Sequence, residues 1–205
     1  MNAKDIERKL RGPRNKKLDR AAAEAATRLV EEAASAGLMD VAYSEVDSPF
    51  GPLLVAATRR GLVRLAYPNE DRDEVLTGLA SKVSPRVLES PSRLDEIRRR
   101  LDAYFERQVR GFDFDVDYSL TRGFVRKVLR ATARIPYGEL STYRLVATRA
   151  GSPRASRAAG NALGSNPIPI VVPCHRVVHS TGGLGGYTGG IERKEFLLKL
   201  EGALD

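Results

Sequence analysis

Cysteine and histidine are scarce in this sequence of 205 residues, which contains one cysteine and two histidines. A single cysteine excludes a disulfide within the chain. One cysteine and two histidines are also too few for the usual four-ligand zinc site, so we expect no metal centre. The thiol of Cys174 is therefore either a buried apolar group or a chemical reagent.

Long apolar runs are missing as well. No run approaches the ~20 apolar residues that a membrane-spanning helix needs. The amino end is charged and lacks the apolar core of a secretion signal. We therefore expect a cytoplasmic protein with no membrane partner.

Acidic residues are nearly absent from one part of the chain, although the net charge is only +8. Residues 121–160 contain nine Lys/Arg and one Asp/Glu, whereas residues 40–118 contain twelve and fifteen. Clustered Lys and Arg indicate a surface that meets a polyanion such as DNA. A solvated basic surface explains the charge alone equally well.

The first 40 residues are distinct in composition. Residues 1–17 are basic and interrupted by Gly12 and Pro13, which predicts a loosely ordered arm. The alanine-rich segment 18–36, stopped by Gly37, predicts a helix. Nothing in the sequence assigns a function to either part.

Residues 41–118 have the pattern of a small α/β domain. Short apolar and β-branched runs in residues 41–68 are separated by turn residues, which predicts strands and a hairpin. Residues 93–109 place apolar side chains on one helical face. The alternation in "FDFDVDY", residues 112–118, predicts another strand.

The segment after residue 118 is mostly helical. Residues 123–135 predict an amphipathic helix that ends at Pro136. Residues 141–151 and 152–164 predict two short helices around a glycine turn, with Ser152 and Pro153 starting the second. This is a candidate helix-turn-helix, although plain helical hairpins are commoner.

The second short helix contains an interior glycine, Gly160, which costs ~1 kcal/mol relative to alanine. Small side chains around it would let the backbone approach a DNA groove or pack closely on a neighbouring helix. Arg154 and Arg157, three residues apart, are expected on one face of this helix.

The single cysteine follows the apolar run "IPIVVP", residues 168–173, which we expect to be extended, stiff and buried. A reactive cysteine needs a neighbouring base or cation, and His175 is the nearest candidate. Without such a partner a lone cysteine in an apolar run is more often inert packing.

Two further features accompany Cys174. Residues 182–190 contain six glycines in nine positions and form either a flexible connector or a pocket wall. The helix expected over residues 192–202 ends on Glu201, where the helix dipole disfavours a carboxylate. A histidine partner would explain this glutamate, and an exposed, solvated side chain is the alternative.

Together, "NPIPIVVPCHRVV" and "GGLGGYTGGIERKEFLLKLEG" closely resemble the O6-alkylguanine-DNA alkyltransferases, also called methylated-DNA-protein-cysteine methyltransferases. The resemblance runs from about Phe124 to Ala203 and is looser over residues 41–118. It implies a ribonuclease-H-like α/β amino-terminal domain over residues 41–118. It also implies a mostly α DNA-binding domain over residues 119–205, with a winged-helix-like helix-turn-helix. Residues 1–40 lie outside the family pattern.

The resemblance assigns chemical roles to five residues. Cys174 would accept the alkyl group, and His175 would take its proton through a water molecule. Glu201 would orient and charge the histidine, as in other activated-nucleophile triads. Asn166 would brace the turn at the cysteine, and Tyr143 would help rotate the target nucleotide and deliver a proton to guanine.

The family pattern also assigns contacts to DNA and to the flipped base. Arg157 would fill the gap that the base leaves in the duplex. The other expected DNA contacts are Arg154, Ser156, Ala158, Gly160 and Arg176. The expected pocket residues are Tyr187, Thr188, Val177, Pro169 and Leu184.

The implied function is direct-reversal DNA repair by a single-turnover methyltransferase without a cofactor or metal. The alkyl group of O6-alkylguanine, with O4-alkylthymine as a further candidate substrate, would move irreversibly to Cys174 after base flipping. The partner would be the minor groove of double-stranded DNA, bound by a monomer with weak sequence specificity, which places the protein on the nucleoid.

Two other functions fit only parts of this sequence. A sensor that binds alkylated DNA without reacting would not need the acceptor thiol of Cys174. A cysteine-histidine hydrolase of esters or peptides would leave the basic helices and Arg157 without a purpose. The sequence therefore favours the alkyltransferase.

Overall fold

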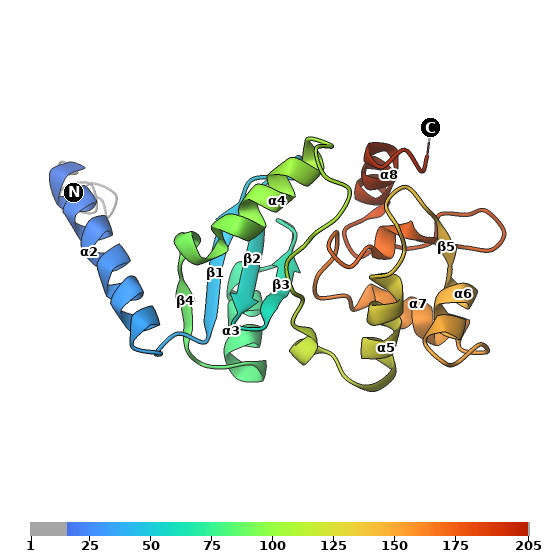
Figure 1. The fold of residues 1–205 in the computed structure, drawn as a ribbon, viewed down its shortest axis with the longest axis horizontal. Coiled ribbons are helices and arrows are strands. Elements are labelled where there is room, and N and C mark those ends of the chain that lie inside the picture. The colour runs from blue at the N-terminus through green and yellow to red at the C-terminus, as the bar shows by residue number, and fades with distance from the viewer. Residues whose placement is uncertain (1–15, 205) are drawn as a thin grey trace, which may run out of the picture. The chain divides into compact units, whose positions relative to one another are not determined.

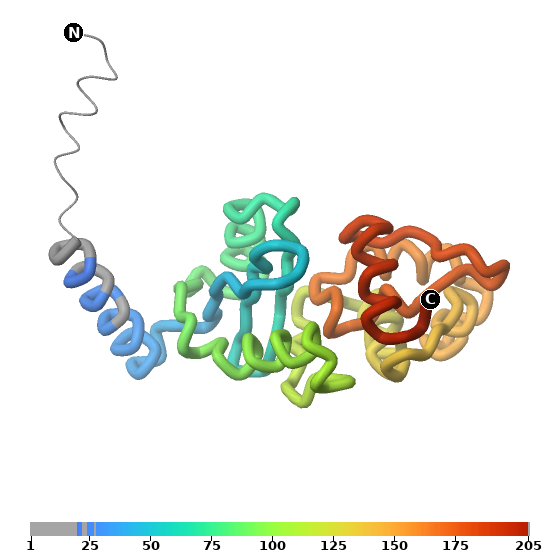
Figure 2. Tube along the Cα trace, turned by 90° about the horizontal axis from the view of Figure 1, so that it is seen from above, coloured from blue at the N-terminus to red at the C-terminus, as the bar shows by residue number. Residues whose placement is uncertain are grey.

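The computed structural model describes residues 16–204. The chain divides into two compact units, residues 1–39 and residues 40–205 (Figures 1 and 2). In the first unit, helix α2 (Lys16–Ser35) occupies the alanine-rich segment, where a helix was predicted. Gly37 ends it with a φ of 71°, a conformation that glycine adopts without strain. The part of the predicted basic arm that precedes Lys16 lies outside the described residues.

A four-stranded sheet forms the first part of the second unit, with the strand order β3-β2-β1-β4. The first three strands are antiparallel neighbours, and β4 pairs with β1 in parallel. The strands are β1 (Val41–Val46), β2 (Leu53–Thr58), β3 (Gly61–Ala66) and β4 (Val87–Glu89). The hairpin predicted over residues 41–68 is therefore present.

Helices cover both faces of this sheet, α3 (Arg72–Lys82) on one and α4 (Asp95–Phe105) on the other, as both views show (Figures 1 and 2). α3 begins at Asp71, whose side chain accepts a hydrogen bond from the Glu74 amide. It packs Leu79 against the strands. A short 3-10 helix, η1 (Pro91–Leu94), leads into α4, whose buried side chains include Tyr104.

The strand predicted over residues 112–118 is wrong. Only Val116 forms a bridge there, to Leu62. The aromatic side chains of this segment form a cluster instead. The Phe112 ring packs against the Tyr104 ring, and the Phe114 ring packs against the Phe112 ring. The alternation thus reflects an aromatic cluster on α4 rather than a sheet face.

The carboxyl-terminal part is mostly helical, as predicted, and continues the same compact unit. α5 packs against both α6 and α7, which form the helix-turn-helix. The elements are η2 (Tyr118–Leu120), α5 (Gly123–Thr132), β5 (Ser141–Thr142), α6 (Tyr143–Arg149), α7 (Ser156–Gly164), η3 (Cys174–Arg176), β6 (Val177–Val178) and α8 (Ile191–Leu200).

The second helix of this pair begins at Ser156, so the prediction that Ser152 and Pro153 start it is wrong. The carbonyl of Ser152 instead accepts a hydrogen bond from the Ala155 amide, which closes a turn. This turn occupies residues 152–155, and the helix starts after it. Over residues 16–204, no helix is long and apolar enough to span a membrane.

Candidate active site

Residues 168–173 form a series of tight turns, so the predicted extended run is wrong. The Asn166 side chain organises these turns, because its Oδ1 accepts from the Ile168 amide at 3.0 Å and its Nδ2 donates to the Val172 carbonyl at 2.9 Å. Ile170 adopts a positive φ of 71° within the turns. The prediction that the segment is buried is confirmed.

Cys174 lies at the end of these turns, in η3, and is 4% exposed. The Asn166 Nδ2 lies 3.1 Å from its Sγ. Burial raises the pKa of Cys174 to about 11, although the Asn166 hydrogen bond and the charge of Lys194 oppose this rise. The resting side chain is therefore a neutral thiol, which needs a base to become a nucleophile.

His175 is fully buried, and its Nε2 lies 2.9 Å from Oε1 of Glu201. Burial lowers the pKa of His175 below its usual value of 6.5, so the ring is neutral at neutral pH. The ionised carboxylate accepts a hydrogen bond from the Nε2–H group, which leaves the lone pair on Nδ1. Within the described part of the chain, the buried Nδ1 has no hydrogen-bonding partner. This atom can accept the thiol proton.

Glu201 is buried in a cluster of hydrogen-bond donors. Arg176 donates to both of its oxygens, at 2.8 and 2.9 Å, and the Tyr104 hydroxyl donates to Oε1 at 2.5 Å. Burial alone would raise the pKa of Glu201, but hydrogen bonds from His175 and Arg176 outweigh it and lower the pKa to about 2. The carboxylate therefore keeps its charge, and the alternative of a solvated glutamate is excluded.

The prediction that Arg176 contacts DNA is wrong. Its side chain is buried, and it also donates to the Ile135 carbonyl at 2.5 Å. The buried Glu201 carboxylate needs this cation for charge balance, which explains why Arg176 points inward. Tyr104, on α4, was missed as a partner of Glu201 because its apolar spacing indicated only packing.

Lys194 on α8 is a second residue that the sequence does not reveal, because lysines in surface helices are usually exposed. It is fully buried, and its Nζ donates to the carbonyls of Val177, at 2.7 Å, and Leu184. Burial lowers the pKa of Lys194 to about 8. The lysine thus ties β6 to the glycine-rich loop, residues 182–190.

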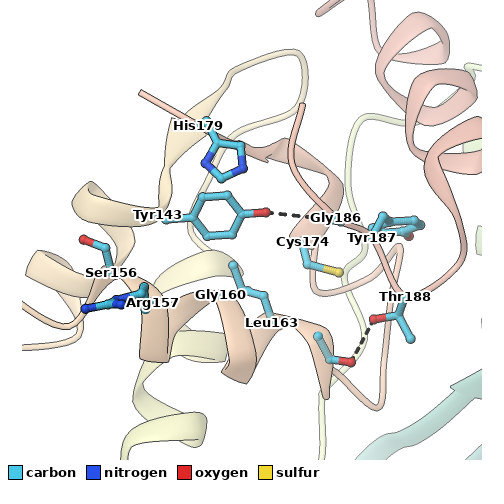
Figure 3. A pocket seen from close by; sticks show the side chains of 11 residues that line it. Tyr143, Ser156, Arg157, Gly160, Leu163, Cys174, His179, Gly186, Tyr187 and Thr188 are labelled. Atoms are coloured by element: carbon cyan, nitrogen blue, oxygen red, sulfur yellow. Dashed lines mark hydrogen bonds between the residues drawn. The ribbon is translucent and has the colours of Figure 1, made fainter. Parts of the chain in front are cut away.

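A cavity of about 500 Å³ opens beside Cys174, between α7 and the glycine-rich loop (Figure 3). This volume is typical of small-ligand sites. Side chains from α6, α7 and the loop surround the Cys174 thiol. The cavity is lined by Tyr143, Ser156, Arg157, Gly160, Leu163, Gly164, Cys174, His179, Gly186, Tyr187 and Thr188.

The glycine-rich loop is a wall of this cavity rather than a simple connector. Its Gly185 has a φ of 74°, and a Cβ there would lie 2.5 Å from the Tyr143 hydroxyl. Tyr143 donates to the Gly186 carbonyl at 3.5 Å, and Thr188 donates to the Gly164 carbonyl at 2.9 Å. These contacts join the loop to α6 and α7.

On α7, Gly160 lies where a Cβ would make only ordinary contact with Tyr143, at 3.7 Å. Close helix packing therefore does not require glycine at this position. Arg157 and Ala158 are exposed, and Arg157 lines the cavity. Arg154 lies in the turn before α7 and lines a separate hollow, so its expected place on one helical face with Arg157 is wrong.

The predicted pocket residues fall into two groups. Tyr187 and Thr188 line the cavity, whereas Val177, Pro169 and Leu184 do not. Of the last three, Val177 and Leu184 are held through their carbonyls by Lys194. Four lining residues were missed, namely Leu163, Gly164, His179 and Gly186. The ring of His179 lies 5.1 Å from that of Tyr143 and is tilted by 47° to it, and no sequence signal marks this histidine.

The arrangement is suited to nucleophilic attack on an electrophilic carbon held in the cavity. A buried thiol, a neutral histidine and a charged carboxylate follow the logic of an activated nucleophile. Among the residues that the structure describes, no three His, Cys, Asp or Glu side chains are placed to hold a metal ion.

Two family models match the chain. Residues 123–203 match the DNA-binding domain of 6-O-methylguanine DNA methyltransferase, and residues 41–118 match its ribonuclease-like domain. The predicted fold class is thereby confirmed. The two matches together cover most of the chain.

Similar proteins carry the same description. A methylated-DNA-protein-cysteine methyltransferase of Methanosarcina barkeri is 40% identical over 159 residues, which are 78% of this chain and 96% of the relative. Its counterpart in Mycolicibacterium paratuberculosis is 40% identical over 161 residues, covering 78% and 92%. A crystal structure of Mycobacterium tuberculosis OGT in complex with DNA superposes with a TM-score of 0.67 at 38% identity, covering 79% of this chain and 93% of the other.

Proposed function

Because the chain belongs to the 6-O-methylguanine DNA methyltransferase family, we propose that it repairs DNA by moving an alkyl group from O6 of guanine to Cys174. It is a DNA-binding methyltransferase whose acceptor is a cysteine. The observation that supports Cys174 as the acceptor is its place at the cavity, beside a neutral histidine with an unpartnered buried Nδ1.

The chemical step uses the groups around the thiol. Nδ1 of His175 takes the Cys174 proton through a water molecule, and Sγ attacks the alkyl carbon. The bond from carbon to O6 breaks, and its electrons go to the guanine. Tyr143 delivers a proton to the leaving guanine and regains one from water, while His175 returns the thiol proton to water. The net change is that the thiol loses one proton and the guanine gains one. Asn166 holds the turn and the sulfur in place.

The product explains why each molecule acts once. The reaction turns Cys174 into a thioether, which has no activated leaving group and offers histidine no proton. Glu201 and His175 therefore cannot restore the thiol by activating water. The number of lesions repaired then equals the number of protein molecules.

The substrate base reaches the cavity by leaving the duplex, at a cost of a few kcal/mol. The exposed Arg157 at the cavity edge takes the place of the base, and Ser156, Ala158 and Gly160 give α7 a thin surface for the minor groove. Arg154, in the turn, contacts phosphate. Binding then has weak sequence specificity and weakens with salt. O4-alkylthymine offers the same electrophilic carbon and is a further substrate.

A monomer suffices for this chemistry, because every reacting group comes from one chain. We place the protein on chromosomal DNA in the cytoplasm.

A titration with substrate DNA tests the function. A duplex containing O6-methylguanine is added in increasing amounts, and the unmodified guanine formed is counted. We expect a plateau at one guanine per protein molecule. Continued turnover would indicate a hydrolase, and tight binding without guanine would indicate a sensor.

The pH dependence of transfer follows from the neutral state of His175. Burial lowers the pKa of His175 below 6.5, and only the neutral ring accepts the thiol proton. As the pH is lowered, the single-turnover rate constant should therefore fall with a midpoint below pH 6.5. DNA binding by Cys174→Ser over the same pH range is the control. A fall centred above pH 6.5 would contradict this assignment.

Arg157→Ala should slow transfer from duplex DNA about 30-fold, because the flipped state loses ~2 kcal/mol when nothing fills the gap. Transfer from free O6-benzylguanine, which needs no flipping, should stay within about twofold. Arg154→Ala is the matched control, and it should lower only salt-dependent binding. Equal losses on duplex and free base would show that Arg157 acts on the cavity instead.

A further inference from the structure

A tyrosine from the amino-terminal part of the chain reaches the wall of the cavity. Tyr67 directly follows β3 and is 2% exposed. Its hydroxyl lies 2.7 Å from the hydroxyl of Tyr187, and the two rings meet edge to face, with centroids 6.2 Å apart. Tyr187 in turn lines the cavity that holds the Cys174 thiol (Figure 3).

Tyr67 is fixed by contacts that do not involve Tyr187. Its amide donates to Glu70 Oε1 at 2.9 Å, and its ring packs edge to face on Phe50 with centroids 5.8 Å apart. The guanidinium of Arg193 lies over the Tyr67 ring, 4.7 Å from the centroid. Arg193 is itself held by Asn69 Oδ1 at 2.6 Å. The Tyr67 hydroxyl is therefore a rigid anchor.

The backbone on either side of Tyr187 is held to α6 and α7 through Gly186 and Thr188. The Tyr187 ring meets the His175 ring edge to face, with centroids 6.3 Å apart. Tyr67 is the only hydrogen-bonding partner of the Tyr187 hydroxyl in the part of the chain that the structure describes. The two rings also leave no room beside them, because a Cβ at Gly189 would lie 2.6 Å from Tyr67 and 2.8 Å from Tyr187.

We infer that Tyr67 is a positioning residue that determines, through Tyr187, how large an alkyl group the cavity accepts. The inference rests on the proposed transfer to Cys174. With the hydroxyl pair intact, the Tyr187 ring is held as a fixed wall close to the acceptor sulfur. Loss of either hydroxyl releases the Tyr187 ring from this anchor, because Tyr67 is the only hydrogen-bonding partner of the Tyr187 hydroxyl among the described residues. The cavity becomes wider, so that a methyl group is held less well while a bulky group gains room.

Tyr67→Phe tests this inference, because it removes one hydroxyl and keeps the ring under Arg193. Single-turnover rate constants are measured with two duplexes, one containing O6-methylguanine and one containing O6-benzylguanine. We expect methyl transfer to slow about tenfold, as for a small misplacement of a reacting group, while benzyl transfer stays within about twofold or rises. Tyr187→Phe removes the same hydrogen bond from the other side and should shift the ratio similarly. The double variant should add nothing further.

Tyr43→Phe is the matched control. It removes a phenol hydroxyl from β1 that contacts Glu89 and lies outside the cavity lining. Its ratio of methyl to benzyl transfer should equal that of the unaltered protein. The inference would be overturned if Tyr67→Phe and Tyr187→Phe slowed methyl transfer and benzyl transfer equally, or changed neither rate. The proposed transfer to Cys174 would still stand. An unaltered protein that takes up neither group would overturn the proposed function, and the inference with it.

Discussion

Replacing Cys174 by serine should abolish alkyl transfer, lowering the rate constant by at least ~1,000-fold. A serine hydroxyl is a far weaker acid than a thiol, and the neutral His175 cannot deprotonate it to a useful extent. The fold should survive, because the two side chains are similar in size. Single-turnover assays with a duplex containing O6-methylguanine measure the loss.

A measurement of DNA binding distinguishes loss of the nucleophile from damage to the DNA-binding surface. Cys174→Ser keeps Arg157 and the glycine-rich loop, so its Kd for the same duplex should change by less than about threefold. Loss of both transfer and binding would show that Cys174 supports the fold or the interface instead. Loss of neither would remove Cys174 from the mechanism.

Replacing Glu201 by glutamine should slow transfer by ~100-fold or more and also destabilise the protein by about 3 kcal/mol. The neutral amide of glutamine cannot stabilise a positive charge on His175 or fix the tautomer of its ring. The buried Arg176 also loses its counter-ion. Urea denaturation and single-turnover kinetics measure the two effects. Glu192→Gln, an exposed position in the first turn of α8, is the control and should change neither.

The same carboxylate should make stability depend on pH. The pKa of Glu201 is about 2, whereas its ordinary value is 4.5, so its stabilising effect is complete above pH 4.5 and is lost as the pH falls toward 2. The difference amounts to about 3 kcal/mol. Glu201→Gln should lack this part of the acid sensitivity. An identical acid transition in both proteins would contradict the buried pairing.

The sequence could predict the site where its residues are close together or follow a family spacing. Asn166, Cys174 and His175 lie within ten positions, and Glu201 ends the next helix. The structure pairs Asn166 with Cys174 and His175 with Glu201. Their pairing depends on short local segments, and therefore the sequence pattern is informative.

The remaining parts of the site depend on distant segments. Tyr104 reaches Glu201 across 97 positions, and Tyr67 reaches Tyr187 across 120. Both tyrosines resemble ordinary core residues in sequence, because an apolar spacing does not show where a hydroxyl points. Arg176 was assigned wrongly to the DNA surface, and Lys194 was missed. Charged side chains are usually exposed, whereas these two donate hydrogen bonds to buried acceptors.

Two local predictions failed because side-chain hydrogen bonds and aromatic packing overrode backbone patterns. Asn166 folds residues 168–173 into turns despite their β-branched composition. The alternating residues 112–118 follow the aromatic cluster around Tyr104 instead of a sheet. In both cases the partner lies outside the segment whose pattern was used.

The amino-terminal part therefore completes the chemical site rather than only covering it. Tyr104 helps to hold the charge of Glu201, and Tyr67 holds the cavity wall. Residues of both parts are needed for the geometry around Cys174.

The mass of the protein after reaction tests the central claim most directly. The unaltered protein is incubated with an excess of duplex containing O6-methylguanine, digested, and its peptides are weighed. We predict that every molecule carries one methyl group, located on Cys174, and that more duplex adds none. Guanine formed without a gain in protein mass, or a methyl group on another residue, would contradict transfer to Cys174.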